Sequence, residues 1–345
     1  MKISAVRFVF FFQLLFSLAG FLPTASATTE KTAVETAKNA LPLRFGIVLS
    51  VGGLGDRSFN DAAYAGVQKL RRTPGCLIDV LEPSDVAAIE SGLEYLCGKK
   101  FDLIVGVGVF ANEPIRRMAE RFPEQRFLLL DSVVSLPNVL SILFNEEEGS
   151  FFAGALAGLL TKTGKAGFLG GMRSPVIAAF ERGFVNGLHF VNPKAEFVSR
   201  YAGETPDAFN SPDVGERLGL EMAGLGADII YHAAGRTGLG LIEAARRGNF
   251  LVIGVDSDQS TLAPGKVVGS VVKRLDVALE KVFQHLQDNT FKGGILTLGL
   301  SDAGIQLELS RFNRGLVSPL IQERLRDVES FLLHRTRKSP ESEKK

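Results

Sequence analysis

The sequence predicts an α/β protein made of two doubly wound parallel-sheet lobes joined by a multi-strand hinge. Short apolar runs alternate with helical segments from Leu43 to Val255. Several of these runs are continuous stretches of β-branched residues and Leu, as is typical of parallel strands covered on both faces. The alternation also falls into two sets, 43–144 and 167–255, which indicates two sheets of similar size.

The first set contains four predicted strands and three predicted helices. The strands are Leu43–Ser50, Leu77–Leu81, Leu103–Val107 and Arg126–Asp131. The helices are Phe59–Arg72, Val86–Cys97 and Pro114–Arg121.

The second set repeats the pattern. Its predicted strands are Ala166–Leu169, Ala195–Tyr201, Asp228–His232 and Leu251–Val255. Its predicted helices are Glu147–Thr161, Ser174–Phe190, Gly215–Leu225 and Leu239–Arg247. Gly154 and Gly158 form a G-x-x-x-G pair, so we expect the helix that carries them to pack closely on a neighbour through small residues.

Beyond Val255 the chain is too short for a third domain. One strand and helix (Val267–Gln287) and the segment Gly293–Leu309 are enough to return to the first lobe and then to the second. We predict a first lobe of 43–145 plus 272–296, a second lobe of 146–271 plus 297–333, and a disordered basic tail over 334–345. The hinge is expected near Asn145, Asp256 and Gly293, and Asn145 is expected to cap the helix that the following Glu residues begin.

The N-terminus predicts secretion. Lys2 and Arg7 precede the apolar run 8–22, and Ala25-Ser26-Ala27 is a small-x-small cleavage site. We predict a signal peptide over 1–27, a linker over 28–42, and a periplasmic or secreted protein. An uncleaved membrane anchor is the alternative, but the run is shorter than a spanning helix requires. The formal net charge of +1 argues against a nucleic-acid partner.

Two cysteines, Cys76 and Cys97, are predicted to lie at one edge of the first sheet, where Cys76 opens a strand and Cys97 ends the next helix. In an oxidising compartment they are either a disulfide or two free thiols, and the sequence leaves both readings open. Neither has the spacing of a metal ligand or of a redox motif, so no metal site is expected.

Polar and aromatic side chains follow the predicted strands, at the sheet edges where such folds bind ligands. Ser50 ends the first strand, and a glycine-rich loop leads from it to Phe59 and Asn60. Asp131, Gly235, Asp256 and Lys273 follow other strands. A ring beside an amide suits a flat ligand, and carboxylates with a Lys suit a polyhydroxyl group such as ribose. The alternatives are a core role for Phe59 and hinge ion pairs for the charged residues.

Enzymatic readings have less support. Gly106-x-Gly108-x-x-Ala111 fits a dinucleotide motif with Asp131 near the expected ribose position, but it follows the third strand rather than the first. The segment around Ser301 lacks the closing glycine of a nucleophile elbow. His232 is expected to be a satisfied core residue. We therefore expect no catalytic residue and no cofactor.

Seven motifs carry a resemblance to a known family. They are VGG with DRSFN (51–60), FNEEEGSF (144–151), KTGK with GGM (162–172), FERGF (180–184), AAGRTG (233–238), IGVDSDQ (253–259) and SVVKRLD (270–276). The chain resembles the basic membrane protein family of ABC-importer solute-binding proteins, the purine nucleoside receptor A type.

The resemblance implies a type I periplasmic-binding fold that holds a nucleoside between two phenylalanines. Phe59 and Phe180 would stack on the base, and Asn60 would contact its edge. The residues that would hold the ribose are Asp131, Gly235, Asp256 and Lys273. It also implies a monomer whose partners are the small-molecule ligand and an ABC permease. We expect the protein to contact the membrane only through that permease.

Two departures from the family pattern bear on specificity and function. No Cys follows the predicted cleavage site, whereas typical members are lipoproteins. Ser50 stands where the family usually has an Asp that pairs with the base, so we expect an altered base preference. The alternative functions are a ligand-sensing periplasmic protein that binds another small molecule and is coupled to a membrane receptor, and a periplasmic nucleotide-cofactor enzyme.

Overall fold

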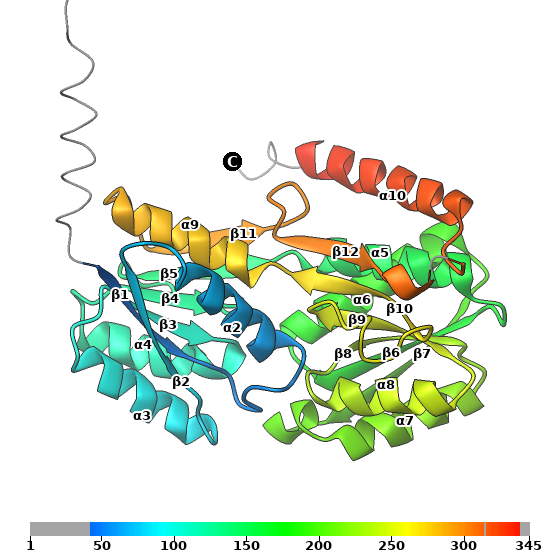
Figure 1. Ribbon diagram of the computed structural model, residues 1–345, viewed down its shortest axis with the longest axis horizontal. Helices are drawn as coiled ribbons and strands as arrows, with labels where there is room; N and C mark the ends of the chain where they lie inside the picture. The colour runs from blue at the N-terminus through cyan, green and yellow to red at the C-terminus, as the bar shows by residue number, and fades with distance from the viewer. Residues whose placement is uncertain (1–41, 314, 339–345) are drawn as a thin grey trace, which may run out of the picture. The chain divides into compact units, whose positions relative to one another are not determined.

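The computed structural model describes residues 42–313 and 315–338 (Figure 1). The predicted signal peptide, nearly all of the predicted linker and the last part of the predicted tail lie outside the described residues. The described chain forms two six-stranded sheets, each covered by helices. These are the two α/β lobes that the sequence predicts.

The first sheet has the strand order β11-β5-β4-β3-β1-β2, and its neighbouring strands all pair in parallel. Its strands are β1 (Leu43–Val48), β2 (Cys76–Leu81), β3 (Leu103–Val107), β4 (Phe127–Leu130), β5 (Val139–Phe144) and β11 (Gly294–Leu298). Its helices are α2 (Phe59–Leu70), α3 (Val86–Cys97), α4 (Asn112–Arg121) and α9 (Leu275–Gln287). The sequence analysis missed β5, because no helix separates it from β4.

The second sheet has the order β12-β10-β9-β8-β6-β7. Its strands are β6 (Lys165–Met172), β7 (Glu196–Gly203), β8 (Ile229–Ala233), β9 (Leu251–Asp256), β10 (Val267–Lys273) and β12 (Ile305–Leu309). Its helices are α5 (Glu146–Leu160), α6 (Pro175–Val191), α7 (Pro212–Gly224), α8 (Thr237–Arg247) and α10 (Pro319–Lys338). β12 runs antiparallel to β10, so this sheet is not purely parallel.

The chain crosses between the sheets after Phe144, after Lys273 and after Leu298. Asn145 therefore lies at a crossing, and its side chain caps α5 by accepting from the Glu148 N–H at 3.3 Å. Asp256 and Gly293, where the hinge was also predicted, do not lie at these crossings. Asp256 ends β9 inside the second sheet, and Gly293 precedes β11 inside the first lobe. Apolar runs predict strands, but they do not show which sheet the last strands join.

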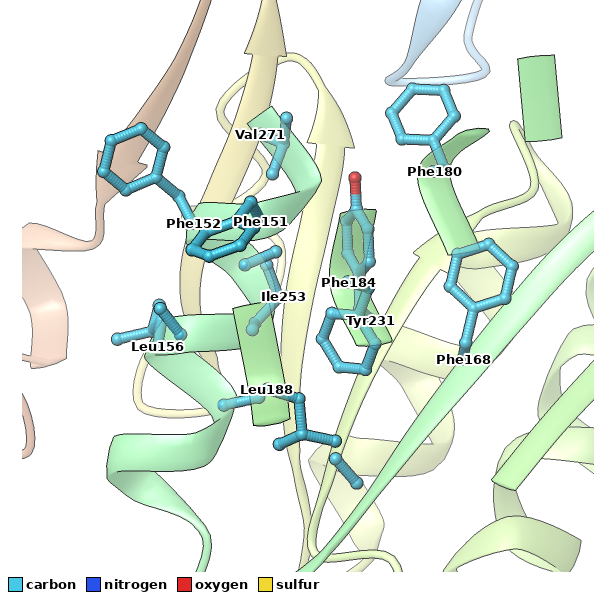
Figure 2. Close-up of a cluster of buried hydrophobic side chains, with 14 of the residues drawn as sticks. Phe151, Phe152, Leu156, Phe168, Phe180, Phe184, Leu188, Tyr231, Ile253 and Val271 are labelled. Carbon is cyan, nitrogen blue, oxygen red and sulfur yellow. The ribbon is translucent and has the colours of Figure 1, made fainter. Parts of the chain in front are cut away.

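Helices α5 and α6 pack with their backbones in close approach. A Cβ atom at Gly154 would lie 1.9 Å from the carbonyl oxygen of Phe184, and one at Gly187 would lie 1.9 Å from that of Phe151. The predicted close packing through Gly154 is confirmed. Figure 2 shows the aromatic core that this helix pair covers, including Phe184 and Tyr231.

The predicted disordered tail is wrong over 334–338, because these residues belong to the C-terminal helix α10. It continues through Lys338, past His334 where the tail was expected to begin. Its apolar side chains Leu325, Val328 and Leu332 are buried in the core of the second lobe. None of the described helices has both the length and the apolar character needed to cross a membrane.

The two cysteines are free thiols, which decides between the two readings left open by the sequence. Cys76 opens β2 and Cys97 ends α3, as predicted. Cys76 packs in the core cluster that contains Phe45. Cys97 packs against the cluster that contains Val48, on the other face of the sheet. Burial raises the pKa of each thiol to about 11.

Candidate functional site

The predicted ligand residues lie around one cavity, which both lobes line. The cavity is bounded by Ser50, Phe59, Asn60, Asp131, Phe180, Gly235, Asp256 and Lys273, together with residues that the sequence analysis did not select. Asp131 directly follows β4, Ser50 comes two residues after β1, and Asp256 ends β9. These residues lie together because the carboxyl ends of parallel strands meet at the same sheet edge.

The loop between β1 and α2 is held by its own polar groups. The Asp56 carboxylate accepts from the backbone N–H groups of Ser58 at 2.9 Å and Asn60 at 2.8 Å. The Asn60 side-chain oxygen accepts from the Ser50 N–H at 2.9 Å. Asn60 therefore fixes the loop with its carbonyl, and its NH₂ group is what it offers to a ligand.

Lys273 is the cation of the site and is 3% exposed. Its ammonium forms ion pairs with Asp131 Oδ2 and, at 2.9 Å, with Glu146 Oε1. An ammonium has three N–H donors, so one is left over beside the cavity. Among the described residues Asp131 Oδ1 has no hydrogen-bond partner. An available donor and an available acceptor thus lie next to each other.

Glu146 is a site residue that the sequence analysis did not select. It is 8% exposed and begins α5, where sequence alone indicates no more than a favourable charge at a helix start. Burial raises the pKa of its carboxyl group, and the Lys273 ammonium opposes that shift.

Asp256 links the lobes from the end of β9. Its Oδ2 accepts from the Ser58 hydroxyl at 2.5 Å. Burial raises its pKa to about 7, although Lys273 and Ser58 act to lower it. Asp256 and Asp131 adopt left-handed backbone conformations, with φ of 63° and 60°. Such conformations are uncommon outside glycine and concentrate at functional sites.

We expect Asp256→Asn to change how stability depends on pH. The carboxyl group titrates near 3.8 ordinarily and near 7 here. The folded chain therefore binds more protons than the unfolded chain between these values, so this group makes the free energy of unfolding fall as pH rises. Asn cannot ionise but still accepts from Ser58. The free energy of unfolding of the variant minus that of wild type should therefore be higher at pH 8 than at pH 5, by about 1 kcal/mol or more. Urea denaturation at both pH values measures this, and a pH-independent difference would contradict it.

Aromatic rings line the cavity from both lobes. Phe59 is partly exposed, whereas Phe180 is 2% exposed and packs on Tyr231 with ring centroids 6.3 Å apart. Two further rings, Phe110 and Phe209, also line the cavity. They meet across the lobes edge to face, with centroids 6.3 Å apart.

Sequence reasoning missed both rings for identifiable reasons. Phe110 lies in the glycine motif that was considered for a dinucleotide. Phe209 ends a 3₁₀ helix (Pro206–Phe209) that has no apolar periodicity.

A second contact joins the lobes at the carbonyl oxygen of Arg57. It accepts from Ser257 Oγ at 2.7 Å and from Gln259 Nε2 at 2.9 Å. Gln259 Oε1 lies 2.9 Å from His232 Nε2. The expectation of a satisfied His232 is only half right, because its Nδ1 is buried without a partner among the described residues. Burial lowers the pKa of His232 to about 4, so the ring is neutral at pH 7.

No group of three or more His, Cys, Asp or Glu side chains within 42–313 and 315–338 is arranged to hold a metal ion. The carboxylates of Asp131 and Glu146 instead form ion pairs with Lys273.

Known proteins resemble the chain over most of its length. The family model for PnrA-like ABC transporter substrate-binding proteins matches residues 45–336. Basic membrane protein A of Borreliella burgdorferi is 34% identical over 260 residues, covering 73% of this chain and 75% of that protein. An uncharacterised lipoprotein of Pyrococcus abyssi is 32% identical over 283 residues, covering 79% of this chain and 70% of that protein.

A solved structure shows the same fold. The crystal structure of an ABC transporter system solute-binding protein from Aeropyrum pernix superimposes with a TM-score of 0.72 and 29% identity, covering 86% of each chain. The two lobes thus have the type I periplasmic-binding fold. The chain belongs to the Bmp family of PnrA-like ABC transporter substrate-binding proteins.

Proposed function

We propose that the protein binds a nucleoside in the cavity between its lobes and delivers it to an ABC permease without changing it chemically. The observation that carries this proposal is that Asp131 Oδ1, which has no hydrogen-bond partner among the described residues, lies beside the remaining N–H donor of Lys273. A hydroxyl group donates one hydrogen bond and accepts others, so it complements such a pair. Bonds to charged partners are also the stronger ones.

The rings beside this pair support a flat group attached to the hydroxyls. Lys273 Nζ lies 5.4 Å from the ring centroid of Phe59 and 5.0 Å from that of Phe180. A ligand hydroxyl about 3 Å from Lys273 Nζ therefore has room to lie beside either ring. A ribose with its base fits this spacing of polar and aromatic groups.

Base preference is proposed to differ from that of the Asp-bearing relatives. Ser50 lies beside Gly108, where a Cβ would be 3.1 Å from Ser50 Oγ and 3.2 Å from Phe59 Cε1. The hydroxyl therefore borders the space next to the Phe59 ring. Ser is neutral and both donates and accepts, whereas Asp only accepts, so a purine N–H is bound less strongly.

A thermal-shift screen of purine and pyrimidine nucleosides, sugars and amino acids tests the proposal. A ligand at 100 times its dissociation constant adds about 2.7 kcal/mol to the free energy of unfolding. Stabilisation by nucleosides alone is the expected result, and stabilisation by sugars or amino acids alone would overturn it. Chemical conversion of a bound nucleoside on long incubation would overturn the claim that the protein is not an enzyme.

Ring removal should identify the stacking residues. Phe59→Ala and Phe180→Ala are each expected to weaken nucleoside affinity by about 1–3 kcal/mol. Phe209→Ala belongs in the same series, because Phe209 also lines the cavity and its side chain is less buried than that of Phe180. Isothermal titration calorimetry measures the losses. Phe45, which is buried away from the cavity, provides the control as Phe45→Leu. Unchanged affinity in all three cavity variants would show that the base does not stack here.

The proposal also covers location and partners. Relatives described as lipoproteins or as ABC solute-binding proteins support an extracytoplasmic location. We propose cleavage after Ala27, a monomeric mature protein and no cofactor. A receptor-coupled sensor that binds a nucleoside would give the same thermal shift, so uptake of labelled nucleoside by cells that lack the protein tells importer from sensor.

A further inference from the structure

The crossings between the lobes meet at the first turn of α5. The Asn145 N–H donates to the Leu298 carbonyl at 2.9 Å, and Glu148 Oε2 accepts from the Leu300 N–H at 2.9 Å. Both bonds hold the crossing between β11 and β12. Glu146 Oε1 is 2.9 Å from Lys273 Nζ, at the crossing that follows β10. The first turn of α5, which follows the crossing after Phe144, is therefore bonded to the crossing after Lys273 and to the crossing after Leu298.

Glu146 contacts the ammonium from outside the cavity. Lys273 and Asp131 line the cavity, and Glu146 does not. Burial acts to lower the pKa of Lys273, but Asp131, Glu146 and Asp256 outweigh it and raise the pKa above its ordinary value. The ammonium therefore stays charged, and its direction depends on how these carboxylates share its three donors.

We propose that Glu146 is a positioning residue for ligand binding, which holds Lys273 so that one ammonium proton and Asp131 Oδ1 both remain available to ligand hydroxyl groups. Without the Glu146 carboxylate, the carboxylate that still contacts the ammonium is Asp131. A neutral amide oxygen at position 146 still accepts from the ammonium but binds it less strongly than a carboxylate does, so a second N–H would turn toward Asp131 and occupy Oδ1. The ligand would lose an acceptor and a donor together. This inference rests on the proposed function, because it takes the ligand to carry ribose hydroxyls.

The test compares Glu146→Gln with Glu147→Gln in the otherwise intact chain. Glu147 is the next residue on the same helix turn, and its ion pair with Arg182 is exposed. The probes are inosine and uridine, each measured beside its 2′,3′-dideoxy counterpart by isothermal titration calorimetry. We expect Glu146→Gln to weaken binding of the ribonucleoside by about tenfold and that of the dideoxynucleoside by less than about twofold. Glu147→Gln should leave both unchanged.

The selective loss is what distinguishes positioning from a structural role. Wild-type affinity of Glu146→Gln for the ribonucleoside would overturn the inference and leave the proposed function standing. Equal losses for ribo- and dideoxynucleosides would also overturn it, because they would show a general distortion of the cavity. If the wild-type chain binds neither ribonucleoside, the proposed function is wrong, and this inference, which depends on it, is wrong as well.

A second variant covers the case in which Glu146→Gln does not fold, as judged by circular dichroism. Glu146→Asp keeps the charge with a shorter side chain. It should also weaken binding of the ribonucleoside more than that of the dideoxynucleoside, but the loss of ribonucleoside affinity should be smaller, about threefold. A folded Glu146→Asp variant without that selectivity would overturn the inference.

Discussion

Replacing Lys273 with Met should lower the free energy of unfolding by about 3–5 kcal/mol, the range for removing one partner of a buried ion pair. The side chain is 1% exposed and contacts the carboxylates of Asp131 and Glu146. Met has a similar length, so the loss comes mainly from charges left buried without a cation. Urea denaturation at pH 7 measures the loss, and nucleoside binding should disappear with it.

The direction of the pH effect provides a second readout. Without the ammonium, the pKa values of the remaining buried carboxyl groups rise, so the folded variant binds more protons than its unfolded chain. The deficit relative to wild type should therefore shrink as pH falls from 7 toward 5. Lys69→Met is the control, because Lys69 is 49% exposed and its ion pairs with Asp276 and Glu280 contribute less than about 1 kcal/mol. A Lys273→Met loss as small as that of Lys69→Met would refute the buried-charge account.

Replacing Gly187 with Ala should destabilise the second lobe by about 3 kcal/mol, because overpacking forces a shift of backbone. The added Cβ would lie 1.9 Å from the Phe151 carbonyl oxygen and 2.8 Å from its Cα. Neither atom belongs to a flexible side chain, so α5 and α6 must separate. The measurement is the midpoint of urea denaturation followed by circular dichroism.

Gly224→Ala is the matched control for this prediction. Gly224 is also helical, as the last residue of α7, and a Cβ there would meet nothing within 4 Å. Ala at such a position leaves stability unchanged or raises it by up to about 1 kcal/mol. Similar losses at both glycines would mean that helix contact is not the cause.

The fold class could be predicted from the sequence because parallel strands buried on both faces have a strong local signature. Runs such as Leu103–Val107 contain no polar residue, and the glycine-rich loop after Ser50 marks a strand end without reference to any partner. Ser50, Asp131, Asp256 and Lys273 followed from the same logic, since residues at the ends of parallel strands share one edge, whereas Phe180 was indicated only by the family resemblance.

What the sequence did not reveal depends on contacts between distant segments. Glu146 is one of three consecutive Glu residues, and only the placement of Lys273 distinguishes it from its neighbours. The ring of Phe209 meets Phe110 from the other lobe. The crossings after Lys273 and Leu298 follow from which sheet accepts β10, β11 and β12, which is decided by pairing with strands far away in the chain.

The late position of β11 and β12 has a consequence for how the chain acquires its structure during synthesis. Gly294 pairs with Leu140 in the first sheet, and Leu309 pairs with Gly269 in the second. Each lobe thus takes an edge strand from the last part of the chain. The first lobe is not finished when the ribosome moves on to the second, so neither lobe matures as an N-terminal unit before its neighbour. Pairings this distant in sequence are slow to form, and both edges stay open to other chains until residues 294–309 have been synthesised.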